Sequence, residues 1–532
     1  MRLKVAVLVL MATASSAIAA PYNVTEKSVF TLEQDMASGR VTSEAIVRAY
    51  LARIRAIDRA GPALHSVIAV NPDALKDARA LDSERKTKGA RGPLHGIPIL
   101  VKDNIETADP MATTAGSLAL ADNVTHRDAP VVARLRAAGA VILGKANLSE
   151  WANIRSAHSI SGWSAIGGQT KNPYVLDRGP CGSSAGSGAA VAASLGAAAL
   201  GTETDGSLVC PGSMDGIVSL KPTVGLLSRT HIIPISHSQD TPGPMTRSVA
   251  EAALLLTVMA GTDPADAATA DADAHKTDYV TALAGDPVEI LKGKRLAVIM
   301  PAGGLDASDT DAIFKTAIQA LKAAGAEIVE IKDTEVPNNY GDDELKVLEY
   351  ELKHDLNDYF ASLPSGPKVH SLADAIAFDD ATPRETALFR QEIFLEAQSR
   401  DDNVDYVTRH DRVRSFARTT LDGIFTANKV DALVEITTDP AARIDTVRRS
   451  EGGRSASFFP AVAGYPHLTV PLGYVQGLPF GISFIGPAWS EAKLLALGAA
   501  YEKLFPARHA PTYIPSAEAT PAVTRAFAPL PD

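Results

Sequence analysis

Residues 178–211 read RGPCGSSAGSGAAVAASLGAAALGTETDGSLVCP and form the most unusual stretch of the chain. Its two ends are rich in glycine and serine, whereas residues 189–201 are apolar and consist mostly of alanine and other small residues. Glycine allows the backbone to approach closely and to adopt φ values that other residues avoid. The pattern therefore predicts two tight loops joined by a buried helix over 189–201. Such loops can direct several backbone N–H groups at one point, as a developing oxyanion requires.

The sequence on both sides of this stretch alternates strands with helices. Short apolar runs predict buried strands at residues 97–101, 141–143, 296–300, 327–331, 431–436, 468–472 and 480–485. Helical spacing of apolar residues is found between several of these runs and again at 491–504. The alternation predicts a single large α/β/α domain whose central mixed sheet is covered by helices on both faces.

The first residues of the chain predict export. Arg2 and Lys4 flank the start of a short apolar run, and small residues lead to an A-x-A pattern that ends at Ala19. The apolar run is too short to span a bilayer comfortably. We therefore expect a signal peptide at 1–19, a periplasmic or secreted mature protein, and no stable membrane association after cleavage.

The mature chain is expected to form one domain over residues 20–532. We divide it into an N-terminal helical segment at about 26–90, a core at about 91–334 and 430–505, and a variable helical segment at about 335–430.

Composition restricts the possible partners and cofactors. The 532 residues are 46% hydrophobic and 21% charged, as in an ordinary globular protein. A net charge of −11 disfavours nucleic acid, whose binders usually present a basic face. The twelve histidines show no H-E-x-x-H or comparable spacing, so no metal is expected. No organic cofactor is expected either.

The two cysteines flank the Gly/Ser stretch. A core of this size needs no disulfide, so we favour Cys181 and Cys210 as packing residues, with a disulfide as the second choice. A catalytic thiol is less favoured, because neither cysteine has a nearby histidine in the sequence to activate it.

Further blocks of sequence carry a family resemblance. They are Gly96–Asn104 (GIPILVKDN), Gly144–Trp151 (GKANLSEW), Leu220–Gly225 (LKPTVG) and Gly464–Pro471 (GYPHLTVP). Together with residues 178–211 they resemble the amidase signature family, and within it the bacterial peptide amidases. The resemblance covers nearly the whole mature chain. It implies the amidase signature fold and hydrolysis of carboxamide bonds.

The resemblance also implies a Ser-Ser-Lys triad, with Ser207 as nucleophile, Ser183 as bridging serine and Lys102 as base. A serine hydroxyl is a poor nucleophile until a base removes its proton. A lysine can be that base only when its pKa lies well below the ordinary value of about 10.4. Burial lowers a lysine pKa, and the apolar run before Lys102 favours burial. The family places the bridging serine in a cis peptide, here Gly182–Ser183.

The remaining site residues follow from the same mapping. The implied oxyanion hole consists of the backbone N–H groups of Thr204, Asp205, Gly206 and Ser207. Supporting roles are expected for Ser184, as a cap of the following helix, and for Asp103, as an orienting or capping residue. Many family members read Gly-Gly-Ser-Ile-Arg at the nucleophile, where this chain has Asp205-Gly-Ser-Leu-Val209. Peptide amidases share this difference, so it indicates the substrate class.

The expected function is that of an exported amidase that hydrolyses carboxamide C–N bonds through an acyl-enzyme. Peptide amides or amino-acid amides are the expected substrates, bound by the segment 335–430 and the loop around Trp163. Two alternatives stay open, a catalytically silent binding protein and an amidotransferase component that supplies ammonia. The intact Lys102, Ser183 and Ser207 argue against the silent protein. Export argues against the amidotransferase, because charged tRNA is cytosolic.

Overall fold

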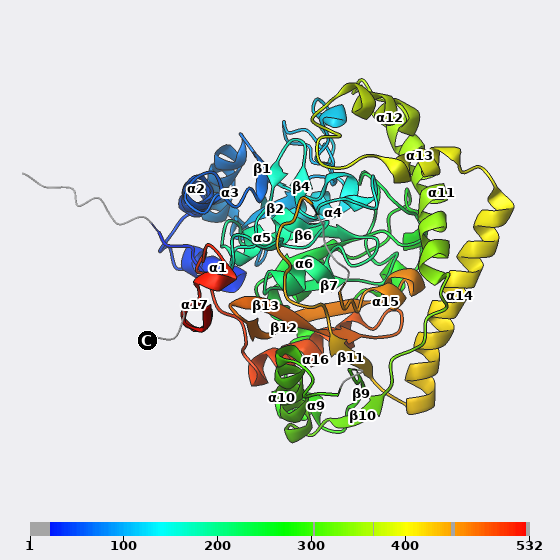
Figure 1. Cartoon of the computed structure of the whole chain (residues 1–532). Helices are drawn as coiled ribbons and strands as arrows, with labels where there is room; N and C mark the ends of the chain where they lie inside the picture. Colours follow the sequence, from blue (N-terminus) through cyan, green and yellow to red (C-terminus); the bar gives the residue numbers. More distant parts are fainter. Residues whose placement is uncertain (1–21, 302–303, 365–366, 448–452, 528–532) are drawn as a thin grey trace, which may run out of the picture.

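The computed structural model describes residues 22–301, 304–364, 367–447 and 453–527, and the expected signal peptide at 1–19 lies outside the described residues. One large sheet runs through the molecule, with helices packed on both of its faces (Figure 1). The predicted α/β/α fold with a mixed central sheet is confirmed. None of the described helices has the length and apolar character needed to cross a membrane.

The large sheet has 11 strands in the order β1-β3-β2-β6-β8-β7-β12-β13-β11-β9-β10. Their bounds are β1 Val67–Val70, β2 Pro98–Lys102, β3 Val141–Ala146, β6 Ala198–Glu203, β7 Val218–Lys221, β8 Thr241–Thr246, β9 Arg295–Ile299, β10 Glu327–Ile331, β11 Ala432–Ile436, β12 His467–Val475 and β13 Leu478–Ile485. β2 runs parallel to β3 and β6, and β9 runs parallel to β10 and β11, while the other neighbours are antiparallel. β4 (Trp163–Ser164) and β5 (Gly168–Gln169) form a separate two-stranded sheet. Each of the seven predicted strands corresponds to one of these, whereas the apolar runs do not predict β1, β6, β7 and β8.

The helices fall into three groups along the chain. The N-terminal group is α1 Val29–Ala37, α2 Ser43–Arg53 and α3 Ala74–Lys88, so the segment 26–90 also contains the edge strand β1. The core helices are α4 Pro130–Ala137, α5 Ala185–Ala192, α6 Val209–Met214, α7 Val249–Met259, α8 Ala272–His275, α9 Pro287–Leu291, α10 Asp309–Ala323, α15 Phe458–Ala463, α16 Glu491–Leu504 and α17 Pro521–Phe527. The segment 335–430 supplies α11 Tyr340–Ala361, α12 Leu372–Ala381, α13 Glu392–Ser399 and α14 Asn403–Asn428, which form the right-hand side of the molecule in Figure 1.

The prediction of a buried helix over 189–201 is wrong. The helix α5 begins at Ala185 and ends at Ala192, and after a turn the chain enters strand β6 at Ala198. The reason is that residues 185–200 are all buried, so no polar face marks the helical or the strand period. With these bounds, both Gly/Ser loops lie at one edge of the sheet, because one loop precedes α5 and the other follows β6.

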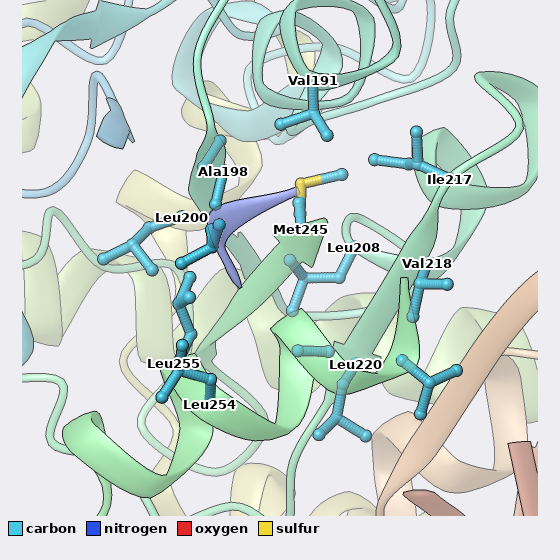
Figure 2. Packing of buried hydrophobic residues seen from close by; sticks show 14 of the residues in the cluster. Val191, Ala198, Leu200, Leu208, Ile217, Val218, Leu220, Met245, Leu254 and Leu255 are labelled. Carbon is cyan, nitrogen blue, oxygen red and sulfur yellow. The ribbon is translucent and has the colours of Figure 1, made fainter. Parts of the chain in front are cut away.

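The hydrophobic core beneath these loops fixes their position. Figure 2 shows side chains of α5, β6, β7, β8 and α7 packed together, among them Val191, Ala198, Leu200, Leu220, Met245 and Leu255. All six are inaccessible to solvent. Protein interiors are packed as densely as organic crystals, so the backbone above such a core has little freedom to move.

Candidate active site

Lys102 is the last residue of β2, and its side chain is fully buried. Its Nζ donates hydrogen bonds to Ser183 Oγ at 2.8 Å, to Thr202 Oγ1 at 2.8 Å and to the Thr202 carbonyl at 3.2 Å. Lys102 forms no ion pair with any described residue. Burial lowers its pKa to about 7, although the charges of Asp240 and Glu203 oppose the shift. At neutral pH a large fraction of this amine is therefore uncharged and able to accept a proton.

Ser183 lies directly before α5, in the turn that contains the cis peptide Gly182–Ser183. The cis peptide is found where the family resemblance implied it. Ser183 is fully buried, and Lys102 is the only described partner of its hydroxyl. Gly182 is required by close contact, because a Cβ atom there would lie 2.1 Å from Ser149 Oγ. Any larger residue at 182 would have to displace the Ser149 hydroxyl, which accepts a hydrogen bond from Gly162 N.

Ser207 lies in the loop between β6 and α6 and is 8% exposed. Its carbonyl accepts a hydrogen bond from Ser184 N at 3.2 Å, which joins this loop to the Ser183 turn. Within the described ranges, the Ser207 hydroxyl and the backbone N–H groups of Asp205, Gly206 and Ser207 have no hydrogen-bond partner in the protein. Gly206 has a φ of 75°, a left-handed conformation that favours glycine. These free donors beside a free hydroxyl are what an oxyanion hole requires.

The next donors along the loop are occupied by a side chain. Glu203 Oε2 accepts from Leu208 N at 2.8 Å and from Val209 N at 3.0 Å, and so satisfies the first turn of α6. Thr204 Oγ1 donates to Asp240 Oδ1 at 2.6 Å, which fixes the opposite end of the loop. The carboxylates therefore position the segment 204–207 without occupying its free N–H groups.

The two residues with expected supporting roles, Ser184 and Asp103, have different surroundings. Ser184 is the residue before α5, but it makes no side-chain cap, so its predicted capping role is wrong. Its hydroxyl instead donates to the Thr202 carbonyl at 3.0 Å and accepts from Thr202 N at 3.2 Å. Asp103 lies 3.7 Å from Lys145 and accepts hydrogen bonds from Thr114, and its orienting role stays a prediction. Burial raises the pKa of Asp103 to about 6.

Thr202 is not identified by the sequence pattern, although it lies at the centre of the site. Its side chain accepts from Lys102 and from Asn104 Nδ2 at 3.0 Å, and its carbonyl accepts from Lys102 and Ser184. A neutral amine has two N–H donors and one lone pair. If the neutral form of Lys102 keeps its two donors on Thr202, its lone pair faces Ser183, the hydroxyl to which the charged amine donates. No local signal singles out this threonine, because its role depends on strand pairing.

Glu344 is likewise not identified from the sequence, because it lies far from the Gly/Ser stretch in the chain. Its carboxyl on α11 is 6% exposed and accepts a hydrogen bond from Gln239 Nε2 at 3.0 Å. Burial and the nearby Asp205 carboxyl raise the pKa of Glu344 well above its ordinary value. Burial likewise raises the pKa of Asp205, which a hydrogen bond from Ser457 opposes. The acidic residue that distinguishes the nucleophile loop thus lies next to a second carboxyl, and the pair holds a proton more readily than isolated carboxyls do.

The prediction that Cys181 and Cys210 are packing residues is wrong. The structure has the second choice, a disulfide between them with a Cα–Cα distance of 5.9 Å and a sequence separation of 29. Sequence alone could not settle the pairing, because the two residues meet only when α6 folds against the Ser183 turn. The bond ties the turn that carries Ser183 to the helix that follows Ser207.

Two cavities with no wall residue in common reach these loops. Cavity A, of about 380 Å³, includes Asn104, Thr202 and Thr204 in its wall, on the side of the lysine. Cavity B, of about 390 Å³, includes Cys181, Cys210 and Met214, on the side of the disulfide. The segment 335–430 contributes to cavity A through Asp355, Asp358 and Tyr359, as expected.

The loop around Trp163 contributes Ile160 and Ser161 to the wall of cavity B. Trp163 lines neither cavity A nor cavity B, and it packs edge-on against Phe389 with ring centroids 5.2 Å apart. A large aromatic side chain in a short strand gains more from burial against another ring than from exposure in a pocket.

One group of side chains offers atoms that could hold a metal ion. His237, Glu351 and Asp355 each place a ligand atom within 4.8 Å of the others, and no other such group occurs in the described ranges. The two ring nitrogens of His237 already contact carboxylates, Nδ1 with Asp355 at 3.0 Å and Nε2 with Glu351 at 3.4 Å. The arrangement matches a histidine that is satisfied within the fold.

Comparisons with known proteins show the family of this chain. The family model described as Amidase matches residues 45–495. A probable amidase of Arabidopsis thaliana is 38% identical over 512 residues, covering 93% of each chain. A putative amidase of Arthroderma benhamiae is 36% identical over 510 residues, covering 90% of this chain and 82% of that protein. The crystal structure of native peptide amidase from Stenotrophomonas maltophilia is 48% identical, with a TM-score of 0.85, and the match covers 92% of this chain and 99% of that one.

Proposed function

This chain belongs to the amidase family and is an amide-hydrolysing enzyme, and we propose that Lys102, Ser183 and Ser207 form its catalytic triad. The observation that carries the proposal is the buried amine of Lys102, which lies 2.8 Å from Ser183 Oγ and has no carboxylate of the described residues paired to it. A lysine in this setting loses its proton near neutral pH and can act as a base.

The proposed mechanism proceeds through an acyl-enzyme. Ser207 Oγ attacks the carbonyl carbon while its proton passes to Ser183, whose own proton passes to Lys102. The backbone N–H groups of the segment 204–207 hold the oxyanion, and loss of one such donor typically costs an enzyme about 10²–10³ in rate. The C–N bond then breaks as the stored proton returns to the leaving nitrogen. Water enters by the reverse route, and the acid leaves.

We further propose that the enzyme is exported and acts on peptide amides or amino-acid amides. The disulfide between Cys181 and Cys210 supports export, because such bonds persist in oxidising compartments. Similarity to a solved peptide amidase at 48% identity supports the substrate class.

The test is release of free ammonia by the mature protein from a panel of peptide amides, amino-acid amides, aliphatic amides and aryl amides. The matched control is Ser207→Ala, which removes one oxygen and should abolish release. Release must occur without tRNA or ATP, because an amidotransferase component would need its partners and substrate. Failure to release ammonia from every amide would favour the silent binding protein.

Export has a separate test. The chain expressed in a bacterial host should be recovered from the periplasm with its N-terminus near residue 20, measured by mass spectrometry. Recovery of the full-length chain in the cytoplasm would contradict it.

A further inference from the structure

The loop with the proposed oxyanion donors begins where the pairing between β6 and β8 ends. The two strands pair in antiparallel register as far as Glu203 and Thr241. Beyond that pair, side chains take the place of the backbone ladder. Thr204 Oγ1 donates to Asp240 Oδ1 at 2.6 Å, and Gln239 Nε2 donates to the Thr204 carbonyl at 3.3 Å. Two consecutive residues therefore hold Thr204, one through its hydroxyl and the other through its carbonyl.

The contact with Gln239 determines the direction of a backbone donor. A trans peptide is planar, so the N–H of a residue points away from the carbonyl of the residue before it. Among the described residues the one cis peptide is Gly182–Ser183, so the peptide between Thr204 and Asp205 is trans. Because the Thr204 carbonyl is directed at Gln239, the Asp205 N–H points to the opposite side. Rotation of this peptide would turn the N–H out of the oxyanion hole.

Helix α11 holds Gln239 by its side chain and by its backbone. The second partner of Gln239 Nε2 is Glu344 Oε1 at 3.0 Å, so both donors of the amide are occupied, one by the oxyanion loop and one by α11. The backbone N–H of Gln239 donates to Ser236 Oγ at 3.1 Å, and that hydroxyl donates to Glu351. Glu344 and Glu351 lie about two turns apart, on one face of α11. All four residues are buried, which fixes these contacts in place.

Resting on the proposed function, we propose that Gln239 is a positioning residue of the oxyanion hole and that Glu344 holds it there from α11. Gln239 acts through the Asp205 N–H and not on the substrate itself. A donor whose direction is fixed before the reaction stabilises the developing charge without reorganisation, and this is the condition under which such donors have a large effect on rate. Loss of the Gln239 amide should therefore weaken binding of the transition state more than binding of the substrate.

The experiment compares the wild type with Gln239→Met, which keeps the length of the side chain and removes both donors. The substrate is the primary amide of the panel above that the wild type hydrolyses fastest, and the probe is the aldehyde with the same acyl group. Ser207 Oγ adds to the aldehyde carbon, its proton passes to Ser183, and the aldehyde oxygen becomes the oxyanion. In Gln239→Met we expect kcat to fall at least about tenfold and KM to stay within about twofold of wild type. The inhibition constant of the aldehyde should rise by about the same factor as kcat falls.

Two variants of Glu344 provide a test that does not depend on the folding of Gln239→Met. Burial and the nearby Asp205 raise the pKa of Glu344 well above its ordinary value, and a protonated carboxyl keeps a carbonyl oxygen that accepts from Gln239. Glu344→Gln offers the same kind of acceptor, whereas Glu344→Met offers none. We expect kcat to be at least about fivefold higher in Glu344→Gln than in Glu344→Met, as for one buried hydrogen bond.

The outcomes separate positioning from packing. The proposal is overturned if Gln239→Met folds and keeps the wild-type kcat, or if its kcat falls while the aldehyde binds each folded molecule as tightly as it binds the wild type. If Gln239→Met does not fold, equal kcat in the two Glu344 variants overturns the proposal. A wild-type protein that releases no ammonia from any amide of the panel would instead overturn the proposed function itself.

Discussion

Two lysines on neighbouring strands are buried to the same extent but have different surroundings. Lys102 on β2 and Lys145 on β3 are both inaccessible to solvent, and Lys145 is paired in register with Val101. Lys145 Nζ donates to the Ile105 carbonyl at 2.5 Å and lies 3.7 Å from Asp103. Among the described residues, Lys102 has hydroxyl and carbonyl partners alone.

The difference shows that burial by itself does not make a lysine a base. Burial lowers the pKa of both amines, but the charge of Asp103 opposes the shift at Lys145 from close by. At Lys102, the charges of Asp240 and Glu203 oppose the lowering of the pKa from a greater distance. Among the described residues, neither carboxyl forms an ion pair with the Lys102 amine. We infer that Lys145 stabilises the fold as a cation, whereas Lys102 remains available for proton transfer.

Lys102→Ala should cause a greater loss of activity than any other change considered below. Because the base is removed, kcat/KM for amide hydrolysis should fall by at least about 10³-fold. The melting temperature should stay within about 4 °C of wild type, since no carboxylate is left without its partner. Amide turnover and calorimetry on the same preparation would measure both. Wild-type turnover in this variant would remove Lys102 from the mechanism.

Lys145→Met should give the opposite result. Removing one member of a buried ion pair leaves Asp103 uncompensated and costs about 3–5 kcal/mol of stability. Urea unfolding should show a lower midpoint, while turnover per folded molecule changes far less than in Lys102→Ala. A stable but inactive Lys145→Met would mean that the two lysines are not functionally distinct.

The disulfide should contribute stability that neither lysine supplies. Replacing both Cys181 and Cys210 by serine frees a loop of 29 residues and should cost about 3–4 kcal/mol, measured by urea unfolding. The disulfide also holds the Ser183 turn against α6, so turnover should fall when the disulfide is removed. Reduction of the wild-type protein should reproduce the change, and an unaltered unfolding midpoint would exclude the stabilising role.

A smaller loss of activity is expected from substitution of Thr202. This residue accepts hydrogen bonds from Lys102 and has no counterpart in the surroundings of Lys145 described above. Thr202→Val keeps the shape but removes one acceptor of the amine, so its lone pair is less well directed at Ser183. We expect kcat/KM to fall by about tenfold, consistent with the loss of one buried hydrogen bond. Thr202→Ser should restore most of the activity and keep the wild-type pH profile. Equal losses in both variants would indicate a packing role.

Much of the site could be predicted because its parts lie in short blocks of sequence. Lys102 lies in one block, and Ser183 and Ser207 lie within another, so a family resemblance locates each of them without knowledge of the fold. The contacts among them depend on strand order, which no local pattern contains. This is why the sequence does not reveal Thr202 and Glu344, and why it leaves the cysteine pairing open.

The apolar runs do not predict the central strand β8 for a related reason. β8 contains Pro242 and Pro244, residues that normally argue against an interior strand. The structure accommodates them because β7 pairs only with Met245 and Thr246, so both prolines lie beyond the end of that ladder. The predicted strands are the ones with continuous β-branched and aliphatic runs, which local propensity favours.

The pH dependence of covalent modification at Ser207 separates the two lysines without requiring a known substrate. Labelling by phenylmethylsulfonyl fluoride, followed by mass spectrometry, reports the attack of Ser207 Oγ in the wild type, in Lys102→Ala and in Lys145→Met. Because the neutral amine is the base and its pKa is lowered to about 7, the wild-type rate should be constant above that pH and fall about tenfold per unit below it. Lys145→Met should follow the same curve, and Lys102→Ala should lose the rate at every pH. Labelling of Ser207 in Lys102→Ala at the wild-type rate would show that the buried amine does not activate the nucleophile.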